Sequence, residues 1–198
     1  MWTSSSSYVS NADICDESMA GITDWTDADY GTGVSSQPTF DGKSCMKLFT
    51  GSFPSSFARR TRDVGTFGAR TVFSLNVYCS SIWTSAVDNS FELECCDGTT
   101  TLDIIFATDG LFIYDGSAFV EAGTNLVVTG QWQEWTFDVN WTAQTVDVYL
   151  EKVLQVSGMD CSYAYGLANG TVRLTQNGAT LTNRLSYVDW FKAGSDFA

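Results

Sequence analysis

Residues Gly130 to Ser157 read GQWQEWTFDVNWTAQTVDVYLEKVLQVS, and this stretch decides the fold class. It holds two runs of alternating side chains, one over residues 133–139 and one over residues 146–150. Successive side chains of a strand point to opposite faces of a sheet, so alternation with a period of two predicts half-buried antiparallel strands. The turn at residues 141–144 joins the two runs, and residues 152–156 extend the hairpin into a third strand. We expect one face of this meander in the core and the other face in water.

Further strand-like runs follow one another at short intervals from Phe40 onward. Asp-Gly pairs at residues 97–98, 109–110 and 115–116 signal tight turns, because glycine tolerates a positive φ. No stretch longer than about ten residues has a helical period. The chain is therefore predicted to be all-β, and 198 residues suit one two-sheet sandwich. The further strands are expected over residues 45–50, 57–63, 66–79, 90–96, 101–108, 111–114, 118–121, 171–175 and 184–192.

The central stretch also resembles a known superfamily. Its order of G-x-W, an aromatic-rich strand, T-V-x-V-Y-L and a strand opening K-V-L is similar to the central hairpins of the concanavalin A-like jelly rolls. That superfamily includes laminin-G-like modules, legume-type lectins and family-16 glycoside hydrolases. The resemblance implies a concanavalin A-like jelly-roll β-sandwich over residues 40–198, whose last strand returns beside an early one. Residues 1–39, with a serine run and an acidic, glycine-spaced stretch, are expected to form an N-terminal arm or wrapping segment.

The composition narrows the choice of partners and chemistry. Ten Lys and Arg stand against twenty-three Asp and Glu, for a formal net charge of −13, so nucleic acid and anionic membrane surfaces are poor partners. The chain has no His, which removes Ser-His-Asp and Cys-His arrangements and the commonest zinc ligand. A pair of carboxylates is the one serious catalytic option that remains.

One such pair lies in the run FELECC. Glu92 and Glu94 share a strand face, about 6.5–7 Å apart along the strand. The run resembles the E-x-D-x-E strand of family-16 glycoside hydrolases, with Glu94 in place of the Asp and Cys96 in place of the acid/base residue. The resemblance therefore implies that the leaving group lacks a proton donor. We expect a solvated strand face here and assign no catalytic residue.

The closing run SYVDWFK at residues 186–192 resembles the last strand of several members of the superfamily. In some of them an Asp at this place and the carbonyls of an early glycine turn hold a structural Ca²⁺. Asp189 matches the Asp, and Gly42 could be the matching turn, so the resemblance implies a candidate calcium site. The alternative is an exposed Asp between two buried aromatic residues.

Sugar sites in β-sandwiches usually combine an aromatic side chain with carboxylates or amides that bind hydroxyl groups. The candidates for glycan binding lie at outward strand positions or in loops, and the sequence does not show whether any two of them converge. The aromatic candidates are Tyr78, Trp83, Tyr114, Tyr149, Tyr163 and Tyr165, with Asn76, Asp103 and Asp147 as polar neighbours.

Four of the ten basic residues, Arg59, Arg60, Arg62 and Arg70, gather in the run ARRTRDVGTFGAR. A solvated strand edge would explain them. The alternative hypothesis is a contact to the acidic surface of an identical or partner subunit, because Arg pairs with carboxylates in a bidentate manner.

Six cysteines, at positions 15, 45, 79, 95, 96 and 161, show no C-x-x-C spacing, so a zinc or redox motif is not expected. They are either disulfides of an extracellular protein or buried thiols. Strand parity predicts that Cys79 and Cys95 point into the core and that Cys96 faces the other way.

The first residues, MWTSSSSYVSNADICDES, have neither a basic start nor an apolar run, so the chain carries no recognisable secretory signal. Taken together, these features favour a non-enzymatic binding or structural module. We expect a virion surface component, such as a phage capsid-decoration or tail protein, that self-associates or binds other virion subunits and attaches to a glycan.

Two other functions stay open. One is an extracellular carbohydrate-binding module whose secretory signal has been removed. The other is a glycosidase or polysaccharide lyase that uses Glu92 and Glu94; FKAG at residues 191–194 resembles the closing motif of family-7 polysaccharide lyases, whose histidine this chain lacks.

Overall fold

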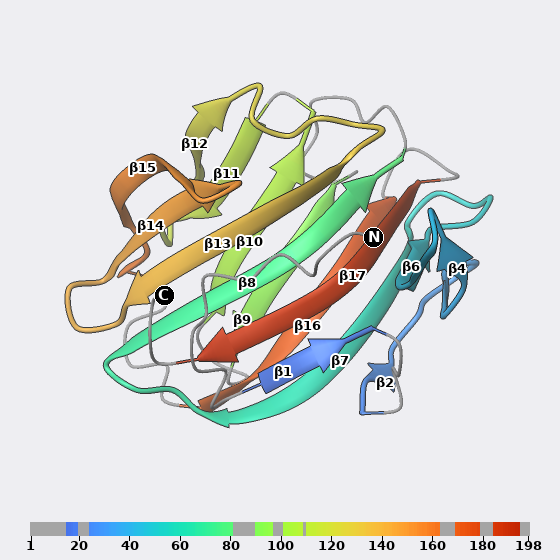
Figure 1. The fold of residues 1–198 in the computed structure, drawn as a ribbon, viewed down its shortest axis with the longest axis horizontal. Helices are drawn as coiled ribbons and strands as arrows, with labels where there is room; N and C mark the ends of the chain where they lie inside the picture. The colour runs from blue at the N-terminus through green and yellow to red at the C-terminus, as the bar shows by residue number, and fades with distance from the viewer. Residues whose placement is uncertain are drawn as a thin grey trace.

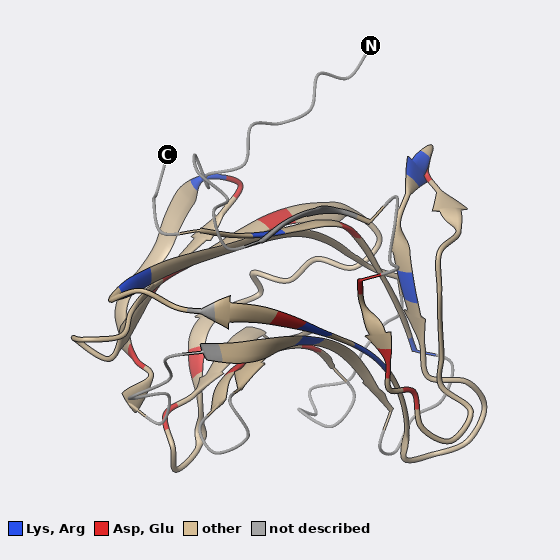
Figure 2. Cartoon of the chain, turned by 90° about the horizontal axis from the view of Figure 1, so that it is seen from below, with Lys and Arg blue, Asp and Glu red and all other residues tan. Residues whose placement is uncertain are grey.

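The protein is a sandwich of two antiparallel sheets (Figures 1 and 2). The computed structural model describes residues 15–19, 24–80, 90–96, 101–108, 110–162, 169–178 and 184–194. The elements β1 to β17 are all strands, as the all-β prediction requires. Among the described residues, no helix is long and apolar enough to cross a membrane.

The larger sheet has eight strands. Their order runs from β15 at one edge to β3 at the other, and β1 pairs with the second half of β17. The strands are β15 (Val153–Asp160), β14 (Thr145–Leu150), β13 (Trp132–Asn140), β8 (Arg70–Cys79), β17 (Leu185–Gly194), β6 (Met46–Phe49), β3 (Val34–Ser36) and β1 (Cys15–Ser18).

The smaller sheet has seven strands, and a separate two-stranded hairpin is formed by β4 (Thr39–Phe40) and β5 (Lys43–Ser44). The strands of the seven-stranded sheet, in spatial order, are β12 (Phe119–Thr124), β11 (Gly110–Tyr114), β10 (Thr101–Ala107), β9 (Phe91–Cys96), β16 (Asn169–Gly178), β7 (Ser56–Thr66) and β2 (Thr26–Asp27).

The central hairpin forms as predicted. β13 and β14 pair in register from Trp135 opposite Leu150 to Asn140 opposite Thr145, and residues 141–144 make the turn. The closing strand β17 pairs with both β6 and β8, which confirms that it returns beside early strands.

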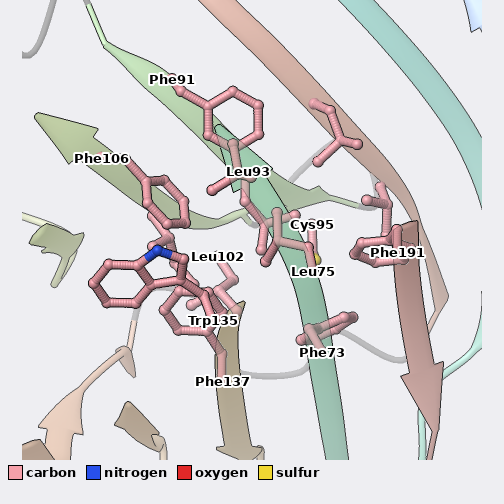
Figure 3. Close-up of a cluster of buried hydrophobic side chains, with 14 of the residues drawn as sticks. Phe73, Leu75, Phe91, Leu93, Cys95, Leu102, Phe106, Trp135, Phe137 and Phe191 are labelled. Atoms are coloured by element: carbon pink, nitrogen blue, oxygen red, sulfur yellow. The ribbon is translucent and has the colours of Figure 1, made fainter. Parts of the chain in front are cut away.

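The core lies between the two sheets and is rich in aromatic rings (Figure 3). Trp135 of β13 meets Phe106 of β10 edge to face, with ring centroids 5.4 Å apart. Phe106 also packs against Phe91 at 5.2 Å and Phe137 at 5.9 Å, so the rings join strands from both sheets. Such contacts stabilise beyond the area they bury.

The prediction that the second face of β13 is in water is wrong. Glu134, Thr136 and Asp138 point away from the core, yet all three are buried. Neighbouring strands supply partners for two of them: the hydroxyl groups of Thr136 and Ser74 lie 2.8 Å apart, and Arg70 Nε donates to Asp138 Oδ1 at 2.6 Å. Alternation indicates which side a residue takes, whereas cross-strand neighbours decide whether water reaches it.

Residues 1–39 are expected to form an arm, and the described part of this segment adds strands to both sheets. β1 pairs with β17, β3 pairs with β6, and β2 pairs with β7. Trp25 is buried and meets Phe191 edge to face at 5.8 Å, so this part of the chain packs on its own sandwich.

Five cysteines with described side chains are free thiols and all are buried. Cys79 and Cys95 lie in the core, as parity predicted, whereas Cys96 is buried outside the core cluster. Burial raises the pKa of the Cys161 thiol to about 12, and it also raises that of Cys45. The buried-thiol alternative therefore holds for these five, while the side chain of Cys15 lies outside the described residues.

Candidate functional site

Three carboxyl groups meet on the outer face of the seven-stranded sheet, which is the face turned away from the core. Along β9, Phe91, Leu93 and Cys95 enter the core, so the intervening Glu92 and Glu94 lie on the outer face. β10 pairs with β9 so that Asp103 stands opposite Glu94.

Two arginines complete the group from the other side of β9. Arg173 on β16 is the cross-strand partner of Glu94, and Arg59 on β7 pairs with Thr175 of β16. Glu94 lies 3.2 Å from Arg59 Nη2 and 3.6 Å from Arg173 Nη1. Arg59 Nε also donates to Thr175 Oγ1 at 2.9 Å, which orients the guanidinium. We call Glu92, Glu94, Asp103, Arg59 and Arg173 the acid–arginine cluster.

Glu92 and Asp103 interact electrostatically within the cluster, and each raises or lowers the pKa of the other. Burial, together with the charges of Glu92 and Glu94, raises the pKa of Asp103 to about 9. Burial and the charge of Glu94 also raise the pKa of Glu92, although Asn177 Nδ2 donates to its Oε2 at 2.9 Å. With a pKa of about 9, the carboxyl group of Asp103 keeps its proton at neutral pH.

The expected solvated strand face is therefore wrong for Glu92, which is 9% exposed. Strand parity correctly placed Glu92 and Glu94 on one side, but it missed the partners that remove them from water. The alternation of Arg173, Thr175 and Asn177 on β16 was the available signal for a polar outer face there. Their position next to β9 depends on sheet order, which parity does not report.

One predicted glycan-binding residue lies beside the cluster. Ile113 of β11 pairs with Ile104 of β10, so the antiparallel register sets Tyr114 opposite Asp103 on the outer face. Tyr114 is half-buried and packs against Phe119, with ring centroids 5.1 Å apart. The structure therefore brings an aromatic ring, three carboxyl groups and two guanidinium groups onto one face.

Apart from Asp103, which belongs to the acid–arginine cluster, the other described glycan candidates lie on the outer face of the eight-stranded sheet. Tyr78 belongs to an aromatic cluster in which Phe40 stacks on Tyr187 at 4.0 Å and meets Tyr78 edge to face at 4.8 Å. Asn76 lies two residues away on β8, and Tyr149 and Asp147 lie on β14. Trp83, Tyr163 and Tyr165 are outside the described residues.

Of the candidate calcium site, the structure shows a contact between Asp189 and Lys43, the residue after Gly42. The carboxylate of Asp189 forms an ion pair with Lys43 and accepts a hydrogen bond from Asn76 Nδ2 at 3.3 Å. In the described part of the chain, no group of three acidic, Cys or His residues could hold a metal ion. Calcium binding stays a prediction.

All four clustered arginines pair with carboxylates of the same chain. Besides Arg59 with Glu94, these pairs are Arg60 with Asp27 at 3.5 Å, Arg62 with Asp24 at 3.8 Å, and Arg70 with Asp138. Arg60 also donates to the carbonyl oxygens of Trp25 and Ser35, which ties the N-terminal segment to β7. Contact with another subunit stays a prediction.

No protein-family model matches the chain, and no curated protein matches it by sequence. Solved structures do match its fold. A sialidase matches with a TM-score of 0.66 and 12% identity over 91% of this chain, but this chain covers only 18% of the sialidase. Cellulose induced protein Cip1 matches with a TM-score of 0.66 and 14% identity over 89% of this chain and 93% of Cip1. Alginate lyase vAL-1 from Chlorella virus matches with a TM-score of 0.57 and 12% identity over 87% of this chain and 93% of the lyase.

These likenesses confirm the predicted concanavalin A-like β-sandwich. At such low identity they show the fold alone, because unrelated sites occur on one fold.

Proposed function

We propose that this concanavalin A-like β-sandwich binds a carbohydrate on the outer face of its seven-stranded sheet. The observation that carries the proposal is the row of Tyr114, Asp103 and Glu94 across three neighbouring strands. An aromatic ring beside carboxyl groups is the combination that sugar sites use, since the ring covers the apolar face of a sugar and the carboxyl oxygens accept its hydroxyl hydrogens.

The arginines make this face suited to binding. The side chain of Glu94 is 12% exposed and its carboxylate is held by Arg59 and Arg173, whose side chains are 25% and 33% exposed. Side chains that are already held in place lose little conformational entropy when a ligand binds. The similar structures, which are a sialidase, a cellulose induced protein and an alginate lyase, add support by analogy of fold.

Replacement of Tyr114 by Ala should weaken glycan binding by roughly tenfold, because removal of an aromatic contact costs about 1.4 kcal/mol. A glycan array identifies the ligand, and calorimetry with purified oligosaccharide measures the change. Tyr149→Ala is the matched control, since Tyr149 is a half-buried strand tyrosine on the other sheet. Loss of binding in Tyr149→Ala with full binding in Tyr114→Ala would move the site to the eight-stranded sheet.

Hydrolysis of a glycosidic bond is a second candidate, and the Glu92–Asp103 pair favours it. A glycosidase needs a protonated carboxyl group as its general acid, and Cys96 stands at the position where the resemblance would place one. Asp103, whose pKa is raised to about 9, could supply that protonated carboxyl group instead. Carboxyl groups whose pKa values are pushed apart can divide the roles of acid and base.

For this second candidate, Glu92→Gln should abolish release of reducing ends while binding persists, because the amide cannot act as nucleophile or base. Chromatography of products from the glycan identified on the array measures this. Hydrolysis that survives the substitution would exclude a catalytic Glu92.

Display on a virion surface, with self-association or contact with other virion subunits, stays a prediction from the sequence. A glycan-binding face would suit attachment by such a component, and it would equally suit an extracellular carbohydrate-binding module.

A further inference from the structure

We propose that the acid–arginine cluster restricts the ligand to uncharged sugars and rejects sugars that carry a carboxylate. This inference rests on the proposed carbohydrate binding at the same face, and it names the class of sugar. The arrangement of charges around Glu94 is the observation behind it.

The two guanidinium groups of the cluster already face a carboxylate of the same chain. Both Arg59 and Arg173 face Glu94, at 3.2 Å and 3.6 Å from its carboxylate oxygens. Arg59 is further held by its hydrogen bond to Thr175 and lies 4.8 Å from the centroid of the Phe57 ring. A ligand carboxylate would have to displace Glu94 to obtain the bidentate contact that arginine offers.

Carboxylate oxygens face the two guanidinium groups. Glu94 lies against both of them, and Asp103 stands opposite Glu94 on the same face. Asp103 keeps its proton at neutral pH, because burial and the charges of Glu92 and Glu94 raise its pKa to about 9. The charged or titratable residues that line the cluster are Arg59 on β7, Glu92 and Glu94 on β9, Asp103 on β10, Tyr114 on β11 and Arg173 on β16.

Neutral and acidic sugars would meet this face differently. A hydroxyl group can donate to Glu94 or to the carboxyl groups of Glu92 and Asp103, whereas a uronic or sialic carboxylate brings acceptors only and is repelled by the same oxygens. The formal net charge of −13 adds repulsion at longer range. The cluster therefore discriminates by charge rather than by shape.

Glu94→Gln tests the inference by releasing both guanidinium groups without a change in shape. The probes are length-matched oligosaccharides of neutral hexoses and of the corresponding hexuronic acids, which differ only at carbon 6. We expect the wild-type protein to prefer the neutral series, and we expect the variant to shift the affinity ratio toward the acidic series by about tenfold or more. Glu121→Gln is the control, because it removes one exposed carboxylate on β12 away from the arginines and should leave the ratio unchanged.

The outcomes separate the inference from the function on which it rests. Wild-type binding that is equal for the two series, or an affinity ratio that Glu94→Gln does not shift, would overturn charge discrimination and leave carbohydrate binding in place. Failure of the wild-type protein to bind either series, or any glycan on the array, would remove the proposed function and the inference together.

Discussion

Replacement of Trp135 by Ala is expected to lower the free energy of unfolding by about 3–5 kcal/mol, the range for deletion of a large buried aromatic side chain. Trp135 is fully buried at the centre of the core, where it contacts Phe106 edge to face and stacks parallel to Phe137 with centroids 6.4 Å apart. The cavity would lie between the two sheets, and neighbouring strands cannot close over it because their hydrogen bonds fix their positions. Urea denaturation followed by circular dichroism measures the change.

Trp132→Ala is the matched control on the same strand. Trp132 is half-buried on the outer face, where it packs against Tyr78 at 5.5 Å and donates from its indole nitrogen to Asp41 Oδ2 at 3.1 Å. Its loss should cost about 1–2 kcal/mol, since much of the ring already meets water. Equal destabilisation by the two substitutions would contradict the assignment of Trp135 to the centre of the core.

The contribution of Asp103 to the folding stability should fall as the pH rises from about 4 to about 9. The folded protein raises the pKa of this carboxyl group from its ordinary value of 3.8 to about 9. Between these values the folded chain binds the proton and the unfolded chain does not, so unfolding releases it and becomes more favourable as pH increases. The contribution is complete below the lower value and is lost as the pH passes through the upper one.

Asp103→Asn should remove this pH dependence, because the amide keeps a donor toward Glu92 and cannot ionise. At pH 9 we expect the variant to exceed the wild type in stability by at least about 1.4 kcal/mol, the equivalent of one unit of pKa shift. Thermal unfolding of both proteins at several values between pH 5 and pH 9 measures the difference. If the melting temperatures of the wild type and the variant change with pH in the same way across this range, Asp103 is an ordinary carboxylate.

Asp115→Asn provides a control of opposite sign. Backbone and side-chain hydrogen bonds from Ala118 and Ser117 lower the pKa of Asp115. Its stabilising effect is therefore present above its ordinary pKa and is lost as the pH falls, so this substitution should act at neutral and alkaline pH by destabilising the turn.

Much of the strand pattern could be predicted because side-chain direction along a strand is local. Alternation over residues 133–139 and 146–150 located β13 and β14 and identified the residues that enter the core. Strand ends were less accurate: the strand predicted from residue 66 begins at Arg70 in the structure, since residues 67–69 form the bend between β7 and β8. Periodicity says little about where backbone pairing stops.

The candidate site could be predicted only in part. Strand parity predicts that Glu92 and Glu94 lie on the same face. Tyr114 and Asp103 are among the glycan-binding candidates that the sequence suggests. The two arginines come from β7 and β16, which meet β9 only through the order of strands in the sheet. For this reason the sequence suggests a solvated strand edge or a subunit contact for Arg59 but does not reveal that it faces Glu94 of the same chain.

By itself, the sequence determined the all-β class, the sandwich and the inward side of each main strand. Successive side chains of a strand point to opposite faces of the sheet, so the spacing of apolar residues along the chain shows which face each residue occupies. Only the tertiary structure decided which outward residues are buried and which charges meet. Pairing between strands distant in sequence brings Asp103, Glu94, Arg173 and Arg59 together, and burial there keeps a proton on Asp103. Those effects depend on distances and on the exclusion of water, which exist only after the sheets have formed.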